Sequence, residues 1–262
     1  MATEVATVGT SRARRVGFYT AVVLALALVL FGLGELLYLG VVGWLGESAL
    51  EEATEPGTGP HLFHVLAHAL FAWLLLISLA TQLRRPERRF AAAVFGLAAM
   101  VTYSLGTLVS GIFDPLEAVA ILLLLAALWL NPGRENATAS PFHKRALRAS
   151  IPILAGGVVV AIVEVGRQLS GLAADQHVEF GHHALMATMA LIVALAALIG
   201  STSLTGRRLV AGLAVSSLLY TGVASMLFPD QVSSLAVLGG VAAIAAAVVY
   251  GWGALTGYST AP

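Results

Sequence analysis

The chain has 262 residues, of which 58% are hydrophobic and only 11% are charged, and its formal net charge is zero. A soluble domain carries roughly 25% charged residues, so this chain has too little polar surface to cover a water-soluble globule. The balanced charge gives no reason to expect a nucleic-acid partner, and the absence of cysteine excludes disulfides, thiolate metal sites and cysteine nucleophiles. We therefore expect a membrane protein whose main partner is the lipid bilayer.

Hydrophobic runs recur along the whole chain. A helix needs about 20 apolar residues to cross roughly 30 Å of hydrocarbon, and the first run is too long for a signal-peptide core, so we expect it to remain as a helix. Turn signals separate the runs, such as Asp114-Pro115, which supplies a helix cap and a proline for the first turn. The sequence predicts an all-α polytopic protein with eight transmembrane helices, over residues 17–45, 61–83, 89–112, 115–131, 148–170, 178–200, 207–227 and 231–254.

Basic residues predict the orientation of these helices. They precede the first span and fill the loops after spans two, four and six, whereas the opposite loops carry acidic residues. Positively charged loops stay in the cytoplasm, so both termini are predicted to be cytoplasmic in a multi-pass protein of the cell membrane. The basic residues concerned are Arg12, Arg14, Arg15, Arg84, Arg85, Arg88, Arg89, Arg134, Lys144, Arg145, Arg148, Arg207 and Arg208.

Short matches between the two parts of the chain suggest an internal duplication. His68-Ala69-Leu70 matches His183-Ala184-Leu185 at an offset of 115 residues, and Phe113 and Phe228 keep that offset. Each part would have four spans, so the two would insert in the same direction. The predicted organisation is a cytoplasmic tail (1–15), a first four-helix half (16–131), a cytoplasmic linker (132–146), a second four-helix half (147–255) and a tail (256–262).

The rare polar residues of the spans are predicted to lie at one depth. With a rise of about 1.5 Å per residue, Glu35 lies about 30 Å from the cytoplasmic surface, and His68, Glu164 and His183 lie about 24–25 Å from it. Ionisable groups inside a membrane are costly and mark functional sites, so we expect Glu35 to face the bundle interior. Six of the seven histidines also fall on this outer side, and only His143 is cytoplasmic.

Histidine spacing favours a metal site in this layer. His64 and His68 are four residues apart on one helical face, a spacing that lets two imidazoles meet one ion. His182 points about 100° away from His183, so the two cannot face one centre. Such nitrogen and oxygen ligands suit zinc, iron, copper or manganese. The candidate metal ligands form one set per half: Glu35, His64 and His68 in the first, and Glu164, Glu179 and His183 in the second.

A structural interpretation of the same residues stays open. His61 and His177, near span ends, are as readily interfacial residues bonded to water or headgroups. Glu164 has Arg167 one turn away, which is the spacing of a helical ion pair. Tyr103 and Tyr220 are more typical of packing than of catalysis.

The two four-helix halves, the cytoplasmic N-terminus and an outer-side histidine on spans two and six resemble the haem A synthase family. In that family, histidines on the second and fourth helix of each half bind haem, so the resemblance implies that His68 and His183 bind this cofactor. Spans four and eight contain no histidine, and the cysteine pair of many members is missing. What the resemblance implies is therefore a haem or divalent transition metal on the outer side rather than synthase activity.

Three functions follow from these residues. The first is a haem- or metal-binding protein of a respiratory or metal-handling system, and the second is a proton- or cation-coupled transporter or channel that uses Glu35 and Glu164. The third is a non-catalytic accessory subunit, with other membrane subunits as its partners. The residues leave open whether the chain is an enzyme.

Overall fold

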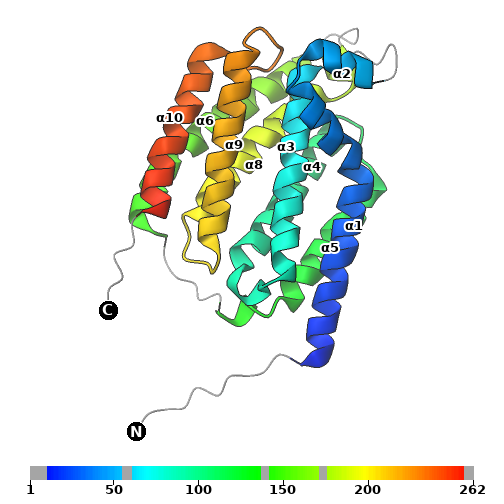
Figure 1. Ribbon diagram of the computed structural model, residues 1–262, viewed down its shortest axis with the longest axis vertical. Helices are drawn as coiled ribbons and strands as arrows, with labels where there is room; N and C mark the ends of the chain where they lie inside the picture. The colour runs from blue at the N-terminus through cyan, green and yellow to red at the C-terminus, as the bar shows by residue number, and fades with distance from the viewer. Residues whose placement is uncertain (1–10, 55–60, 137–141, 171–175, 257–262) are drawn as a thin grey trace.

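The computed structural model describes residues 11–54, 61–136, 142–170 and 176–256, which form a bundle of helices without strands in these ranges (Figure 1). Parts of the predicted tails 1–15 and 256–262, and of the predicted linker 132–146, lie outside the described residues. The helices are α1 (Arg12–Gly43), α2 (Glu47–Ala53), α3 (Leu62–Ala80), α4 (Phe90–Val109), α5 (Pro115–Leu130), α6 (Lys144–Ser170), α7 (Gln176–Glu179), α8 (His182–Gly200), α9 (Arg207–Leu227) and α10 (Ala236–Leu255).

Seven of the described helices are long and apolar enough to cross a membrane, and the chain is therefore a multi-pass membrane protein. These helices are α1, α3, α4, α6, α8, α9 and α10. The apolar α5 has 16 residues and a length of about 24 Å, so it falls short of a standard span. Eight crossings therefore remain a prediction that depends on α5.

Side-chain contacts show where the two ends of α5 lie. Near its start, the Thr107 hydroxyl of α4 donates to Glu117 Oε2 at 2.7 Å. At its end, Arg14 of α1 donates to the carbonyls of Leu130 and Asn131 at 3.3 and 3.1 Å. The helix thus reaches from the end of α4 to the beginning of α1, which lie at opposite ends of the bundle in Figure 1.

The helices α3 and α8 form the centre of the bundle, because most of their residues are buried, whereas α1, α6 and α10 are mainly exposed. Around them, α1 and α4 each pack against α3 and α5, and α6 and α9 each pack against α8 and α10. The two groups of four meet chiefly where α4 packs on α8. The two parts of the chain thus have the same order of neighbours, and their duplication remains a prediction.

Small residues allow the helix backbones to approach closely, as is common in membranes. A Cβ built on Gly222 of α9 would lie 2.8 Å from the carbonyl oxygen of Gly240 on α10, and one built on Gly240 would lie 2.6 Å from the carbonyl of Gly222. A Cβ on Gly40 of α1 would likewise collide with Ala69 of α3. These glycines set the spacing of two helix pairs.

The bundle has two chemically different ends. Every lysine and arginine except Arg167 belongs to the beginning of α1, α6 or α9 or to the turns after α3 and α5. Backbone bonds join these segments to the turn before α9, from Ala91 N to Thr205 O and from His143 N to Ser201 O, both at 2.9 Å. We call this the arginine end. At the opposite end α3 and α8 begin, and with them six of the seven histidines.

Candidate functional site

Four histidines meet where α3 and α8 begin. All six distances between the ring centroids of His61, His64, His177 and His182 lie between 4.0 and 5.9 Å. We call these four residues the histidine cluster. Two more imidazoles adjoin it, because His68 lies 6.5 Å from His182 and His183 lies 5.7 Å from His177.

The cluster forms because two central helices begin at the same end of the bundle. His61 caps α3 and His64 lies in its first turn, whereas His182 opens α8. The Gln168 side chain of α6 holds the second group in place, since it accepts from the Ala184 amide at 3.3 Å and donates to the Val178 carbonyl at 2.8 Å. It thereby joins α6 to the start of α8 and to the short helix that carries His177.

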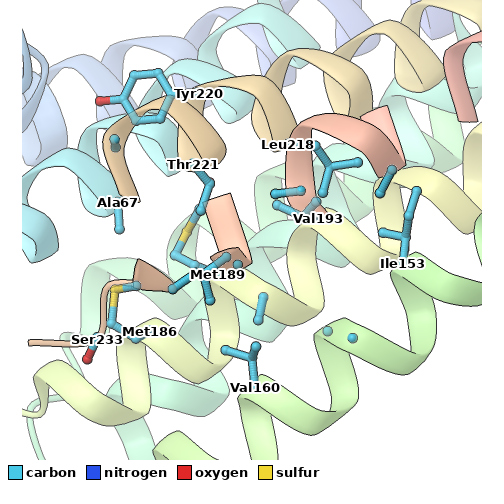
Figure 2. Close-up of a pocket in the computed structure, with 18 of the residues that line it drawn as sticks. Ala67, Ile153, Val160, Met186, Met189, Val193, Leu218, Tyr220, Thr221 and Ser233 are labelled. Atoms are coloured by element: carbon cyan, nitrogen blue, oxygen red, sulfur yellow. The ribbon is translucent and has the colours of Figure 1, made fainter. Parts of the chain in front are cut away.

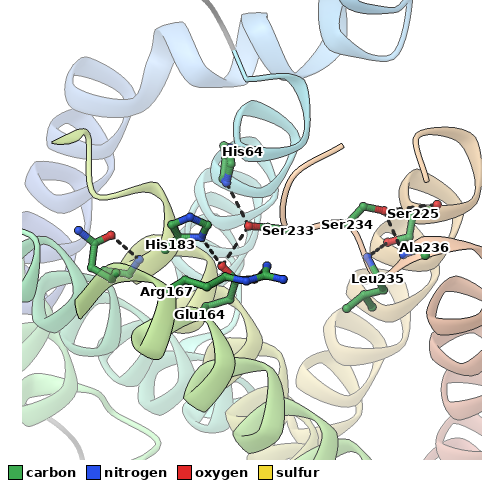
Figure 3. A network of polar contacts seen from close by, with 11 residues as sticks. His64, Glu164, Arg167, His183, Ser225, Ser233, Ser234, Leu235 and Ala236 are labelled. Carbon is green, nitrogen blue, oxygen red and sulfur yellow. Dashed lines mark hydrogen bonds and ion pairs between the residues drawn. The ribbon is translucent and has the colours of Figure 1, made fainter. Parts of the chain in front are cut away.

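A buried carboxylate lies next to the cluster (Figure 3). Glu164 of α6 is 3% exposed, and its Oε2 lies 2.6 Å from His183 Nδ1 and 3.0 Å from the Ser233 hydroxyl, which donates to it. Its Oε1 accepts from Arg167 Nη1 at 2.8 Å. The negative charge also lies near the first turn of α8, where a helix dipole favours an anion. Glu164 is therefore fully bonded, and the predicted ion pair with Arg167 is confirmed.

The bonding of Ser233 indicates which nitrogen of His64 carries the proton. Ser233 Oγ donates to the carboxylate of Glu164, so its oxygen is left to accept from His64 Nε2, which lies 3.3 Å away (Figure 3). In the neutral imidazole, a proton on Nε2 leaves the lone pair on Nδ1. This chain of carboxylate, hydroxyl and imidazole resembles the outer-shell bonding that orients histidine ligands of metals.

Three nitrogens in this region are buried without a hydrogen-bond partner in the part of the chain that the structure describes. They belong to three different histidines, and each such group costs about 1–3 kcal/mol when its bonding capacity is unused. A hydrogen-bond donor or a metal ion bound to these lone pairs would remove this cost. The atoms are His64 Nδ1, His68 Nε2 and His182 Nδ1.

The two predicted half-sites are not what the structure assembles. Glu35 is exposed on α1, so the expectation that it faces the interior is wrong, and Glu179 is also exposed. No described contact joins either carboxylate to the histidines. The structure brings His64 together with His182 across the halves and pairs His183 with Glu164. His183 bonds Glu164 and His182 stacks on His64, yet both rings lie near His177, at 5.7 and 5.9 Å, so the expectation that they cannot approach one centre does not hold.

Sequence reasoning missed the central part that His61, His177 and His182 take, and it missed Ser233 altogether. Ser233 comes from the turn between α9 and α10, has a positive φ of 65° and is buried. Nothing in the local sequence marks it. The two tyrosines were interpreted correctly, since Tyr103 stacks on Phe71 and the Tyr220 hydroxyl donates to the Leu66 carbonyl at 3.1 Å.

The cluster is not a finished metal centre. Among the described residues, no group of three or more His, Asp or Glu side chains already has an arrangement that holds a metal ion. Binding of an ion would require imidazole rings to turn about their side-chain torsions.

Comparison with known proteins adds no relative, because no protein-family model, curated protein or solved structure matches the chain. Functional inference therefore depends on the residues of this site.

Proposed function

We propose that this protein binds a transition-metal ion at the outer face of the cell membrane through the histidine cluster, in a metal-handling role. The observation that carries the proposal is the mutual proximity of four imidazoles, His61, His64, His177 and His182, with ring centroids 4.0–5.9 Å apart. The arginine end is the cytoplasmic side by the positive-inside rule, which puts the cluster outside.

These distances suit a metal centre. Imidazole nitrogens bind zinc at about 2.0–2.1 Å, which places each ring centroid roughly 3 Å from the ion and two centroids roughly 5 Å apart in a tetrahedral site. The unpartnered Nδ1 atoms of His64 and His182 supply two lone pairs. The bond from His64 Nε2 through Ser233 to Glu164 would hold the first of these rings in the ligating tautomer.

The donor set favours particular ions. Neutral imidazoles suit zinc, copper and nickel, whereas magnesium and calcium require oxygen ligands. Four nitrogens favour tetrahedral zinc, and copper(II) would compete because it binds such sites more tightly. Zinc and copper(II) are therefore the probes to use first.

Metal binding is favoured over haem and over proton transport. The clustered rings pack against one another, and a porphyrin between them would have to separate them. His68 and His183, the haem ligands that the resemblance implies, have no described contact with each other. The transport hypothesis used two interior carboxylates, but Glu35 is exposed and Glu164 already bonds three side chains.

The test is metal titration of protein purified in detergent with a tag that contains no histidine. After chelator treatment, calorimetry should show one zinc ion per chain, and elemental analysis should recover it after dialysis. His64→Ala and His182→Ala should each weaken binding at least tenfold, because each removes a ligand.

His143→Ala is the matched control, since His143 lies at the arginine end and its pKa is lowered by partial burial and by Arg207. It should bind zinc as the unaltered protein does. The proposal would be overturned if all the histidine variants bound zinc equally well. It would also be overturned if the unaltered protein bound no more zinc than a detergent blank. A Soret band in the absorption spectrum that disappears in His68→Ala and His183→Ala would instead support haem.

A further inference from the structure

A large apolar cavity lies inside the bundle, and no histidine lines it. Its volume is about 440 Å³, and helices α3, α6, α8, α9 and α10 all contribute to its wall (Figure 2). This volume falls within the range of about 300–1,000 Å³ that is typical of sites for small organic ligands.

The chemistry of the wall is uniform. Leu, Ile, Val, Met, Phe, Ala, Pro and Gly make up almost all of it, and none of the described lining residues is charged or a histidine. Its polar side chains are three hydroxyls, those of Ser233, Thr221 and Tyr220. A matching ligand is thus mainly hydrocarbon and carries no charge on the part that the cavity encloses.

The cavity runs along the helices. Ser233 and Phe63 lie at the end where α3 begins, whereas Pro152 lies eight residues into α6, counted from the arginine end. The lining segment of α3, from Phe63 to Leu70, and that of α6, from Pro152 to Val160, each cover about 10–12 Å. This shape fits an extended chain that lies parallel to the helix axes.

The wall formed by α6 is open to the surroundings. Pro152 and Gly156 line the cavity and are exposed, and a Cβ built on Gly156 would have no atom within 4 Å. In a membrane these residues face hydrocarbon, so an apolar chain can enter sideways without crossing water.

We propose that this cavity binds a neutral single-chain lipid, with its hydrocarbon tail among α3, α6, α8, α9 and α10 and an uncharged hydroxyl head that donates to the remaining lone pair of Ser233 Oγ. The adjacent carboxylate argues against a charged head, because Glu164 already bonds Arg167 and His183 and would repel a phosphate or carboxylate. Ser233 bonds both Glu164 and His64, so the head lies next to the histidine cluster. The proposal does not depend on metal binding.

Photolabelling of the full chain in lipid nanodiscs tests this inference. The probe is a long-chain alcohol with a diazirine in its tail, and mass spectrometry locates the label. We expect label on the peptide that contains Met186 and Met189. Excess unlabelled long-chain alcohol should remove it, whereas the matching fatty acid and a lysophosphatidic acid should not.

Two variants fill the cavity from two different helices, Gly156→Phe on α6 and Ala242→Phe on α10, and each should lower this labelling at least tenfold. Their controls lie on the same helices, are exposed and do not line the cavity: Gly166→Phe and Ala245→Phe. A single symmetric peak in gel filtration identifies the variants that fold. One folded cavity-filling variant is enough to test the proposal. Three results would overturn the proposal. The first is labelling that persists in a folded cavity-filling variant, and the second is label found only on the outward faces of the helices. The third is equal competition by the charged lipids.

Discussion

Glu164 is a buried carboxylate with three different side-chain partners. Hydrogen bonds to a buried charge are worth about 1.5–3 kcal/mol, whereas the exposed Arg167 contributes less because solvent screens it. Most of the stabilisation therefore comes from His183 and Ser233. These two bonds join α6, α8 and the turn before α10 at a single point.

Glu164→Gln keeps the side-chain volume and removes the charge. We expect the free energy of unfolding to fall by about 1.5–3 kcal/mol, because His183 and Ser233 lose their charged acceptor. Denaturation of the detergent-solubilised protein measures this change. The exposed Glu179→Gln should stay within about 0.5 kcal/mol of the unaltered protein. A Glu164 variant as stable as the Glu179 variant would contradict this assignment.

Two residues near the start of α10 have a backbone conformation that favours glycine. Ser233 has φ 65° and Ala236 has φ 54°. Ser233 is held there by its bonds to Glu164 and His64, whereas no described side-chain bond of its own holds the exposed Ala236, whose amide donates to the Ser234 hydroxyl at 3.2 Å.

Ala236→Gly should therefore stabilise the protein by about 0.5–1 kcal/mol, since the left-handed conformation costs an alanine roughly 1–2 kcal/mol and part of the gain is lost to unfolded-chain entropy. The control is Ala245→Gly, an exposed position in the middle of the same helix, which should destabilise by about 1 kcal/mol. In the same denaturation assay, the free energy of unfolding should rise in Ala236→Gly and fall in Ala245→Gly. Equal destabilisation by the two substitutions would contradict this prediction.

At the scale of helices, the pair α9 and α10 depends on the contact between Gly222 and Gly240. Each glycine backbone occupies the space that a Cβ on the other would need. The nearby Gly212 of α9 has no atom within 4 Å of a built Cβ, so glycine there has no packing role.

Gly222→Val should separate α9 from α10 and lower the free energy of unfolding by about 1–3 kcal/mol, which is the typical cost of overpacking. Gly212→Ala should be neutral or slightly stabilising, because alanine is the better helix former. Thermal unfolding in one detergent compares the two variants. A Gly222 variant that melts with the unaltered protein would show that this contact does not hold the helices together.

The length of the apolar runs was enough to predict the long helices of this fold, but not the short α2. The run predicted at 61–83 became α3 and a short 3-10 turn, and the run at 178–200 became part of α7 and all of α8. Helix rise also placed Glu164 and His183 at one depth, and the two residues are in contact. Depth says nothing of rotation about the axis, however, and α1 is apolar on every face, so its sequence did not indicate where Glu35 points. The contribution of Ser233 was unpredictable because it depends on a turn conformation.

At the scale of the whole molecule, the concentration of basic residues at one end predicts an orientation that can be tested. The chain has no cysteine, so an introduced thiol is the only one. An impermeant maleimide applied to intact cells should label Asp230→Cys and leave Glu87→Cys unlabelled until the membrane is permeabilised. The reverse result would place the histidine cluster inside the cell.

The same labelling tests whether α5 crosses the membrane. Phe113→Cys, before α5, should react from outside, whereas Glu135→Cys, after it, should react only once the cell is permeabilised. Equal accessibility would mean that α5 does not cross, and the count of crossings would then be seven.

The α9–α10 turn has a consequence for the biogenesis of the protein. Ser233 is more than 160 residues downstream of His64, yet it links that ring to Glu164. During synthesis, the histidines leave the ribosome with α3 and α8 before this turn does. Until α10 has been inserted, the imidazole of His64 has no hydroxyl to fix its tautomer. The site is therefore completed only by the last helix, and a truncated chain released early would carry all of the histidines without the bond that orients His64.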